Sequence, residues 1–396
     1  MSVADIATVD ELLAQAKTKY AEVFKETPTV AGLAPGRVNI IGEHTDYNDG
    51  FVFPMALPLY TVVVGALSPD GEGNTIRVLT TNEGADAPRL VEFPVPTTDA
   101  PLKPSKEPAW ANYFKGVVAK FHGPVRGFKA VIVSSVPLGG GLSSSASLEV
   151  ASYTFLEALL NSPAASPRAK ALCCQKAEHE FAGVPCGIMD QFVTSMAQEG
   201  QALLIDCRSL VCEQIPISDP ELSVVIINSN VRHSLAGSEY AARRDDCFAA
   251  AKAMGKDSLR DATLDDILGK QWPLSEVQVK RASHVVTEIA RTLQAVVALK
   301  EKNYTRFGEL MTQSHHSLRN EYEVSCPELD ELVGLAVAVP GVLGSRMTGG
   351  GFGGCTVTLV RQDSVAALLT HVAERYSGTP TFYMATASRG AYSVTL

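Results

Sequence analysis

A glycine- and serine-rich stretch is the part of this sequence whose residue types and spacing most plainly allow chemistry. Residues 137–146 read Pro-Leu-Gly-Gly-Gly-Leu-Ser-Ser-Ser-Ala, after an apolar run at 131–133 and before an expected helix at 147–160. Glycines let the backbone adopt positive φ and approach a ligand closely. Serines at the start of a helix add hydroxyls to its unpaired N–H groups and its positive dipole end. The stretch therefore predicts an anion site, with nucleotide phosphate as the expected anion. A Gly/Ser linker is the alternative, but the flanking strand and helix argue against it.

A second dense group of polar side chains follows another apolar run. Val38, Ile40 and Ile41 suggest a strand, and every side chain from Glu43 to Asn48 can then form hydrogen bonds. Glu, His and Asp behind a glycine, at the end of a buried strand, are the composition expected of a site that grips hydroxyl groups. A solvated loop would look equally polar, so these residues alone leave both interpretations open.

Two further stretches carry possible chemistry. Asp190 lies between Met189 and Gln191, ahead of an apolar helical face, where an aspartate can also be a simple helix cap. Residues 349–354 formally match the dinucleotide motif G-x-G-x-x-G. A strand at 356–360 follows them, however, whereas that motif must open a helix. We therefore expect this glycine loop to fold over an active cleft and to meet the first two stretches.

Together these stretches resemble the motifs of one enzyme group. Residues 36–47 read Gly-Arg-Val-Asn-Ile-Ile-Gly-Glu-His-Thr-Asp-Tyr and resemble the signature near the start of galactokinases. The loop at 137–146 resembles the ATP motif of the wider GHMP kinase superfamily, and the loop at 344–355 resembles a third motif of that superfamily. The motifs lie in the expected order between residues 34 and 355, so the resemblance covers nearly the whole chain.

The resemblance implies a function. A galactokinase transfers the γ-phosphoryl group of ATP, with Mg²⁺, to the anomeric hydroxyl of α-D-galactose, giving galactose 1-phosphate and ADP in the first committed step of galactose use. Such a transfer depends on positioning and charge neutralisation more than on covalent chemistry. Two alternatives stay open: an N-acetylgalactosamine kinase of the same group, and a sensor that binds ATP and galactose without turnover. The intact phosphate loop and Asp190 favour the enzyme.

The resemblance also implies roles for individual residues. The catalytic pair is Asp190, as base or orienter, and Arg37, which steadies the transferring phosphoryl group. The implied sugar contacts are Arg37, Glu43, His44, Asp46, Gly187, Asp190 and Tyr240. The implied nucleotide contacts are Gly139, Gly140, Gly141, Ser143, Ser144, Ser145 and Trp110, with Tyr113 as a further wall of the adenine pocket. The implied Mg²⁺ ligands are Ser145, with Ser144 as the alternative, and Glu178.

Without the resemblance, some of these residues have ordinary interpretations. Trp110 reads as a core aromatic on a short helix. Glu178 reads as a surface residue of an expected helix at 169–181, and Tyr240 as a half-exposed helical tyrosine.

The implied fold is the two-domain α+β fold of GHMP kinases, with the active site in the cleft between the domains. A chain of 396 residues is long enough for two or three domains. We expect a mixed-sheet N-terminal domain over 1–200 and an antiparallel-sheet-plus-helices C-terminal domain over 201–396. Further expected elements are an amphipathic helix at 8–26, a hairpin with surface loops within 70–109, strands at 201–206 and 223–228, and mostly helix over 256–325.

Composition excludes several classes of protein. The net charge of −9 and the absence of a basic block argue against nucleic-acid binding. Eight scattered cysteines without a C-x-x-C pair fit reduced thiols in the cytoplasm. The N-terminus lacks a signal-peptide pattern, and prolines make the uncharged run at 51–69 a buried strand rather than a membrane span. His315 and His316 are expected at the surface, because no Cys, Asp or Glu stands at metal-ligand spacing. The oligomeric state stays open.

Overall fold

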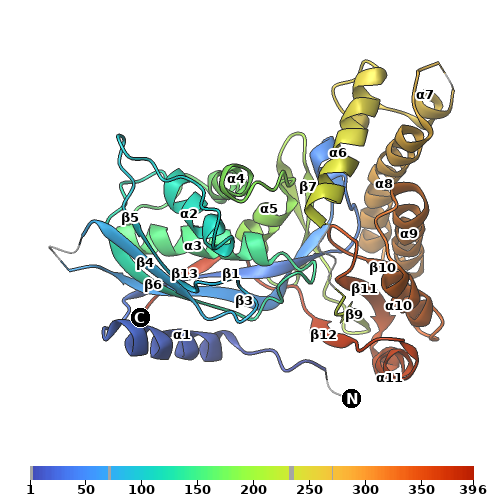
Figure 1. The fold of residues 1–396 in the computed structure, drawn as a ribbon. Coiled ribbons are helices and arrows are strands. Elements are labelled where there is room, and N and C mark those ends of the chain that lie inside the picture. The colour runs from blue at the N-terminus through green and yellow to red at the C-terminus, as the bar shows by residue number, and fades with distance from the viewer. Residues whose placement is uncertain (1–2, 70–72, 232–235, 270) are drawn as a thin grey trace.

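The computed structural model describes residues 3–69, 73–231, 236–269 and 271–396. Its described strands form three sheets, of six, four and three strands. The six-stranded sheet and its helices lie at one end of the molecule, and the four-stranded sheet with a group of longer helices lies at the other (Figure 1). This is the two-part α+β arrangement expected from the sequence.

The first sheet is mixed, as predicted. Its strand order is β13-β1-β3-β6-β4-β5. β4 pairs with β6 in parallel, and the other pairings are antiparallel. The hairpin expected within 70–109 is the pair β4–β5. The strands are β1 (Val30–Asn39), β3 (Pro54–Leu67), β4 (Thr75–Thr80), β5 (Leu90–Pro94), β6 (Phe128–Ser134) and β13 (Tyr392–Thr395).

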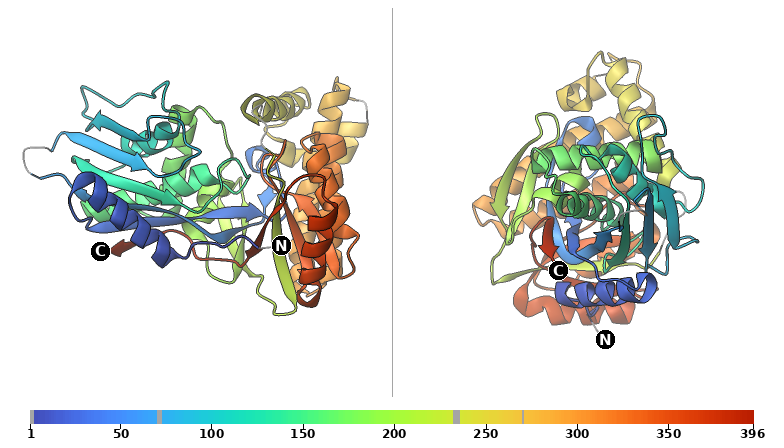
Figure 2. Two further views of the ribbon diagram at one scale, coloured as in Figure 1. Left: turned by 60° about the horizontal axis from the view of Figure 1, so that its bottom comes forward. Right: turned by 90° about the vertical axis from the view of Figure 1, so that its left-hand side faces the viewer.

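Helices cover both faces of this sheet. α1 packs on one face, and α2 and α3 lie over the other (Figure 2). α1 is the expected amphipathic helix and begins with a capping box between Thr8 and Glu11. α3 approaches β1 so closely that a Cβ on Gly32 would lie 2.3 Å from the backbone nitrogen of Phe155. The helices of this half are α1 (Val9–Phe24), α2 (Trp110–Lys120), α3 (Ser144–Leu160), α4 (Pro167–Ala177), its π-helical continuation η2 (Glu178–Ala182) and α5 (Met189–Met196).

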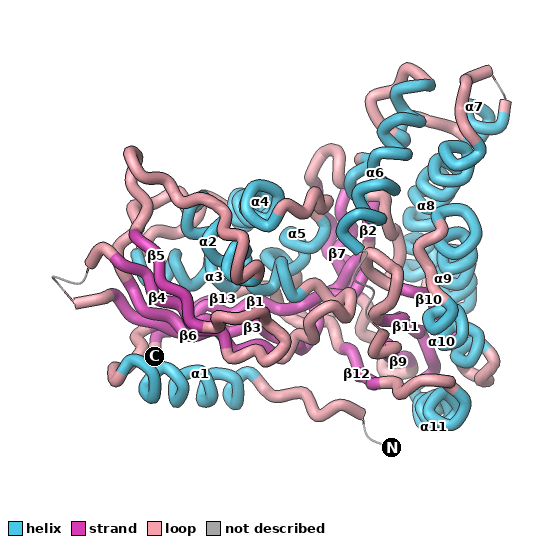
Figure 3. The backbone as a smooth tube through the Cα atoms, viewed as in Figure 1, coloured by secondary structure: helices cyan, strands magenta, loops and turns pink. Residues whose placement is uncertain are grey.

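The second sheet is antiparallel between its described strands, with the order β10-β11-β9-β12. Helices pack beside it, and α8 and α9 run side by side (Figure 3). The predicted antiparallel sheet with helices is therefore confirmed. Its strands are β9 (Leu222–Asn228), β10 (Val342–Met347), β11 (Cys355–Arg361) and β12 (Thr381–Ala385). Its helices are α6 (Ala236–Ala253), α7 (Leu264–Leu268), α8 (Glu276–Lys300), α9 (Tyr304–Ser317), α10 (Pro327–Val337) and α11 (Val365–Arg375). Short helical turns are η1 (Asp46–Asn48), η3 (Leu259–Asp261), η4 (Leu318–Tyr322) and η5 (Gln362–Ser364).

The domain boundary expected at residue 200 stays a prediction, and strands from both sides of it pair with each other. β7 (Gln201–Asp206) and β8 (Val211–Pro216) form the third sheet with β2 (Phe51–Val52) from the first half. β13, at the end of the chain, pairs with β1 in the first sheet. The last residues therefore belong structurally to the first half.

The surface position expected for His315 is wrong. His315 is 1 % exposed on α9, and its Nε2 lies 3.2 Å from Oδ1 of Asp330 on α10. Its Nδ1 accepts the N–H of Met347 at 3.3 Å. Its neighbour His316 is exposed, as expected. None of the described helices is long and apolar enough to cross a membrane.

Candidate active site

Nearly all the predicted site residues line one cavity of about 540 Å³ between the two halves. Those lining it are Arg37, Glu43, His44, Asp46, Gly139, Gly141, Ser143, Ser144, Ser145, Glu178, Gly187, Asp190 and Tyr240. A larger hollow of about 1030 Å³ lies near β9 and β12, and none of the described residues that line it is a predicted site residue. We therefore take the smaller cavity as the candidate site.

Asp190 lies in the first turn of α5, and its carboxylate is held from two sides. Arg37 of β1 donates Nε–H and Nη2–H to its oxygens at 2.7 and 2.6 Å. The hydroxyl of Ser143 donates to Oδ2 at 2.6 Å. The N-cap of α5 is Ile188, so the simple capping interpretation does not describe Asp190. Burial lowers the pKa of Arg37, but the Asp190 carboxylate outweighs this and raises it, so the guanidinium stays charged.

Arg37 also ties the phosphate loop to the same point, because its Nη1 donates to the carbonyl of Gly141 at 2.6 Å. The loop turns through positive φ at Gly139 (69°), Gly141 (73°) and Ser143 (62°). α3 begins at Ser144, so the unpaired N–H groups of its first turn belong to this loop. The predicted strand, glycine loop and helix are therefore confirmed as β6, the loop and α3.

Gly140 does not line the cavity and faces the second glycine loop instead. A Cβ on Gly354 would lie 3.0 Å from the carbonyl carbon of Gly140, and one on Gly349 would lie 2.8 Å from the oxygen of Gly141. The expected meeting of the two glycine loops over the cleft is therefore confirmed.

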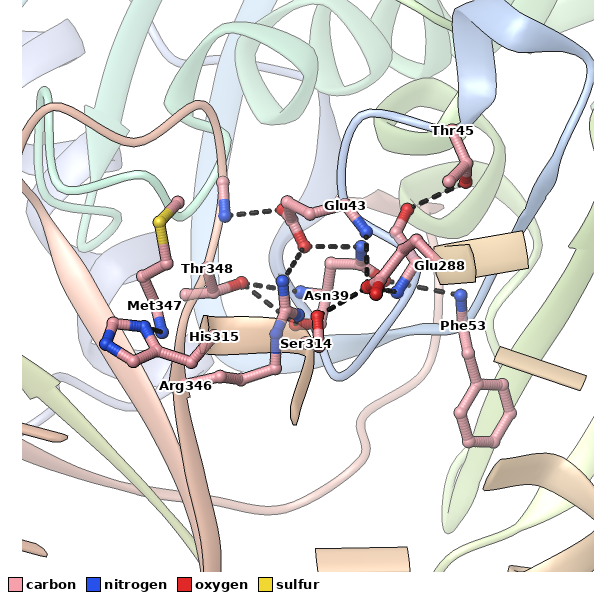
Figure 4. Close-up of polar contacts among 12 residues, drawn as sticks. Asn39, Glu43, Thr45, Phe53, Glu288, Ser314, His315, Arg346, Met347 and Thr348 are labelled. Carbon is pink, nitrogen blue, oxygen red and sulfur yellow. Dashed lines mark hydrogen bonds and ion pairs between the residues drawn. The ribbon is translucent and has the colours of Figure 1, made fainter. Parts of the chain in front are cut away.

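Glu43 is buried in a polar network (Figure 4). Its Oε2 accepts Nδ2–H of Asn39 at 2.6 Å and Nη2–H of Arg346 at 2.9 Å. Its Oε1 accepts the N–H of Gly349 at 2.6 Å. Burial raises the pKa of Glu43, although Arg346 opposes the shift. The carboxylate thus joins β1, β10 and the second glycine loop at the edge of the cavity.

His44 presents a neutral imidazole to the cavity. Burial and the neighbouring His284 lower its pKa to about 3. Its Nδ1 lies 2.6 Å from the hydroxyl of Tyr47, and that hydroxyl lies 2.8 Å from the hydroxyl of Tyr322. Among the described residues, Nε2 has no hydrogen-bond partner. The ring therefore has Nδ1 bonded to Tyr47, while Nε2 is buried near the backbone of Gly350.

Asp46 and Gly187 are in direct contact. A Cβ on Gly187 would lie 1.7 Å from Oδ2 of Asp46, so glycine is required for the carboxylate to sit there. Burial and the nearby Asp190 raise the pKa of Asp46 to about 7. The ring of Tyr240, from α6, lies 5.5 Å from that of His44 and completes this wall of the cavity.

Trp110 and Tyr113 line a neighbouring pocket of about 300 Å³. Leu138 and Ser144 of the phosphate loop line the same pocket. Trp110 is 8 % exposed, and its Nε1–H donates to the carbonyl of Pro88 at 3.2 Å. An aromatic pocket thus adjoins the phosphate loop.

Glu178 is 4 % exposed, unlike the surface residue that its local sequence suggests. Its carboxylate accepts a hydrogen bond from Gln191 at 2.7 Å, and the nearby Ser145 hydroxyl favours its charged form. Burial and the nearby Asp190 raise its pKa to about 7. The two expected metal ligands therefore line the same cavity, although the described residues contain no group of three or more His, Cys, Asp or Glu arranged for a metal ion.

Three buried polar residues near the cavity were not predicted. Arg346 is fully buried and donates to the carbonyl of Asn39 at 3.0 Å. His284 and Glu288 on α8 are also fully buried and bond the backbone at 42–43. The sequence carries no local signal for His284 and Glu288, because both lie beside the expected apolar face of α8 rather than on it, and their burial depends on contacts with distant segments.

Comparison with known proteins places the chain in a family. Residues 18–67 match the galactokinase galactose-binding signature, 112–198 the GHMP kinases N-terminal domain and 295–378 the GHMP kinases C-terminal region. A galactokinase from Homo sapiens is 56 % identical over 97 % of this chain and 97 % of that protein. The chain belongs to the galactokinase family. A galactokinase from Bos taurus is 55 % identical over 99 % of each chain.

Solved structures agree with this assignment. Lactococcus lactis galactokinase, solved in complex with galactose, is 34 % identical with a TM-score of 0.89, covering 97 % of this chain and 100 % of that chain. Methanococcus jannaschii mevalonate kinase, at 18 % identity and a TM-score of 0.62 over 91 % of this chain and 99 % of that chain, shares the fold alone. The expected GHMP kinase fold is therefore confirmed, and this galactokinase-family member is an ATP-dependent sugar kinase.

Proposed function

We propose that this protein transfers the γ-phosphoryl group of ATP to the anomeric hydroxyl of α-D-galactose. The hydroxyl oxygen bonds to the γ-phosphorus, the bond from that phosphorus to the β–γ bridging oxygen breaks, and ADP leaves. Asp190 takes the hydroxyl proton or holds the hydroxyl in line for attack. The observation that carries the proposal is the Asp190 carboxylate, held by Arg37 and Ser143 where the sugar side of the cavity meets the phosphate loop.

Arg37 supports the transfer through its fixed charge. Its guanidinium bonds both the Asp190 carboxylate and the carbonyl of Gly141, so it lies between the base and the phosphate loop. A preorganised cation at this point stabilises charge that develops on the transferring phosphoryl group.

The sugar is gripped on the other side of Asp190. His44 presents its imidazole to the cavity, and Asp46 and Tyr240 add further polar groups to the same wall. Glu43 lies at the edge of this wall, and Gly187 leaves room for the Asp46 carboxylate. Hydroxyl-specific groups of this kind discriminate strongly, because an analogue that lacks the matching hydroxyl leaves buried polar groups unpaired.

ATP binds across the phosphate loop. The triphosphate lies along Gly139, Gly141 and Ser143 to Ser145, at the start of α3. The adenine ring enters the adjoining pocket walled by Trp110 and Tyr113.

Mg²⁺ accompanies the nucleotide. The Ser145 hydroxyl and the buried Glu178 carboxylate are hard oxygen donors, and one carboxylate together with substrate phosphates suits Mg²⁺. When bound, the ion neutralises charge on the triphosphate. Glu178→Gln should raise the Mg²⁺ concentration needed for half-maximal activity, and an unchanged requirement would remove Glu178 from the metal site.

The eight free thiols fit a cytoplasmic location for the protein.

ADP release on adding galactose is the direct test. We expect release that needs both substrates, and kcat/KM for glucose lower by about 10⁴-fold than for galactose. Faster release with N-acetylgalactosamine would favour the related kinase, and binding of ATP and galactose without release would favour a sensor. Comparable kcat/KM values for glucose and galactose would contradict the assignment of His44 and Asp46.

Asp190→Asn tests the chemical step. Asparagine keeps the shape but loses the charge, so kcat should fall by about 10²–10⁴-fold. ATP affinity measured by calorimetry should be retained, since the nucleotide depends on the phosphate loop. Near-normal turnover in this variant would make Asp190 a structural residue.

A further inference from the structure

The turn formed by Gly42, Glu43 and His44 brings an imidazole into the cavity along an unusual backbone path. Gly42 has φ of 98° and His44 has φ of 62°. A left-handed conformation is uncommon for a residue other than glycine and persists where neighbouring structure holds it. Whatever holds this turn therefore determines where His44 meets a ligand.

Two side chains of α8 hold the turn. Oε1 of Glu288 accepts the N–H groups of Gly42 and Glu43 at 3.0 and 3.4 Å. Nε2 of His284 donates to the carbonyl of Glu43 at 3.1 Å. His284 and Glu288 lie four residues apart and so share one face of α8. One helix thus fixes three backbone groups of two consecutive residues, and Figure 4 shows Glu288 beside the turn.

Both side chains are themselves immobilised, and each is fully buried. Glu288 also accepts from the hydroxyl of Ser314 and from Nε of Arg291, the latter at 2.8 Å. Burial raises the pKa of Glu288, but Arg291 outweighs this and the pKa falls to about 2. Burial lowers the pKa of His284 to about 4. A carbonyl can only accept, so Nε2 of His284 carries a proton, and Nδ1 lies 2.9 Å from the hydroxyl oxygen of Ser317.

Neither His284 nor Glu288 lines the cavity, so neither touches a bound sugar. We infer that His284 and Glu288 are positioning residues for the sugar, which lock the backbone at 42–43 so that His44 enters the cavity in one orientation. The inference rests on the proposed galactokinase function. It adds to the sugar site two residues that act through the backbone at 42–43. A purely structural role would instead lower the amount or stability of folded enzyme without changing the galactose KM of the molecules that fold.

His284→Leu and His284→Gln are the decisive variants. Leucine fills the space but leaves the Glu43 carbonyl without its donor, whereas glutamine can offer an N–H to that carbonyl. We expect His284→Leu to raise KM for galactose about tenfold, the scale of a lost buried hydrogen bond, and to change KM for ATP less than about twofold. His284→Gln should recover most of the loss. An unchanged galactose KM in His284→Leu, or equal rises in both KM values, overturns the inference.

Val285→Ala is the matched control, because Val285 is the next residue on α8, is fully buried and makes none of the three hydrogen bonds to the turn. It should lower the melting temperature and leave both KM values unchanged; a rise in galactose KM equal to that of His284→Leu overturns the inference.

If His284→Leu does not fold, Glu288→Gln replaces it, since glutamine keeps the shape and one acceptor but not the charge. Its galactose KM should rise while its ATP KM does not, and an unchanged galactose KM overturns the inference. A failure of the proposed function can be told apart from a failure of this inference, because in the first case the wild-type protein would release no ADP with galactose.

Discussion

Gly187 has no room for a side chain, because a Cβ there would lie 1.7 Å from Oδ2 of Asp46. Its φ is not positive, so alanine is allowed by the backbone and its effect is purely steric. Gly187→Ala should displace the Asp46 carboxylate and weaken galactose binding by about tenfold or more, the scale of a lost buried hydrogen bond to a charged group. ATP binding should be unchanged. Titration calorimetry with each substrate measures both affinities.

Gly334→Ala on α10 is the control for this prediction, because a Cβ there meets nothing within 4 Å. It should leave both affinities intact and slightly stabilise the helix. Wild-type galactose affinity in Gly187→Ala would mean that Asp46 is not a sugar ligand.

Asp46 also gives the substrate-free protein a pH dependence. Burial and the nearby Asp190 raise its folded-state pKa to about 7. The folded protein therefore binds this proton more tightly than the unfolded chain, so stability from this group is greatest at low pH and is lost as pH rises towards 7. The stability of Asp46→Asn relative to wild type should thus be higher at about pH 8 than at about pH 5, by about 1 kcal/mol, because the carboxylate is only partly buried at the cavity wall. Thermal unfolding without galactose measures this, and an equal difference at both pH values would contradict it.

Residue types at the site could be predicted from the sequence, but their partners could not. Asp190 could equally be a helix cap until its contact with Arg37, 153 residues earlier in the chain, is seen. The residues around Glu178 in the sequence suggest a surface position, yet the side chain of Gln191 donates a hydrogen bond to its carboxylate. His315 is similarly buried, beside Asp330 of α10. Burial of a polar residue is a tertiary property, and local spacing does not contain it.

The phosphate loop is an element whose glycines are not equivalent. Gly141 has φ of 73°, and a Cβ there would lie 3.2 Å from the carbonyl oxygen of Thr348. A β-branched residue in the left-handed region costs about 1–2 kcal/mol, so Gly141→Val should move the loop and weaken ATP binding about tenfold or more while the fold is retained. Calorimetry with ATP, together with circular dichroism, measures both properties.

Gly140→Ala is the comparison within the same loop. Gly140 does not have a positive φ, and its nearest contact is 3.3 Å to the side chain of Pro137. Its loss of ATP affinity should therefore be smaller than that of Gly141→Val. Equal affinities in both variants and the wild-type protein would remove this loop from the nucleotide site.

Elements with strong local chemistry were predictable. The glycines and serines at 137–146, between an apolar run and a helical pattern, are enough to place a loop between β6 and α3. The strand β11 after the second glycine loop is enough to exclude a dinucleotide fold. The pairing of β2 with β7 was not predictable, because two short strands from distant segments carry no signal of their register.

At the scale of the whole molecule, the chain closes on itself. β13 forms one edge of the first sheet beside β1, and β1 leads to Arg37 and the sugar-binding turn. The last residues of the C-terminal half therefore cover an edge that would otherwise be open to pairing with another chain. A division at residue 200 that treated the halves as independent would leave this edge uncovered.

Val394→Asp tests whether the end of the chain stabilises the first sheet. Val394 is partly buried, pairs with Ala31 and packs against the apolar cluster between α1 and the first sheet, so a carboxylate there would be placed against apolar side chains. We expect stability to fall by about 2 kcal/mol, with a melting temperature lower by about 2 °C and faster hydrogen exchange along β1. Ser393→Asp is the matched variant, because Ser393 is the preceding residue of the same strand and is exposed. It should melt and exchange like the wild-type protein. If both variants melt at the wild-type temperature, β13 is not needed to hold the first sheet.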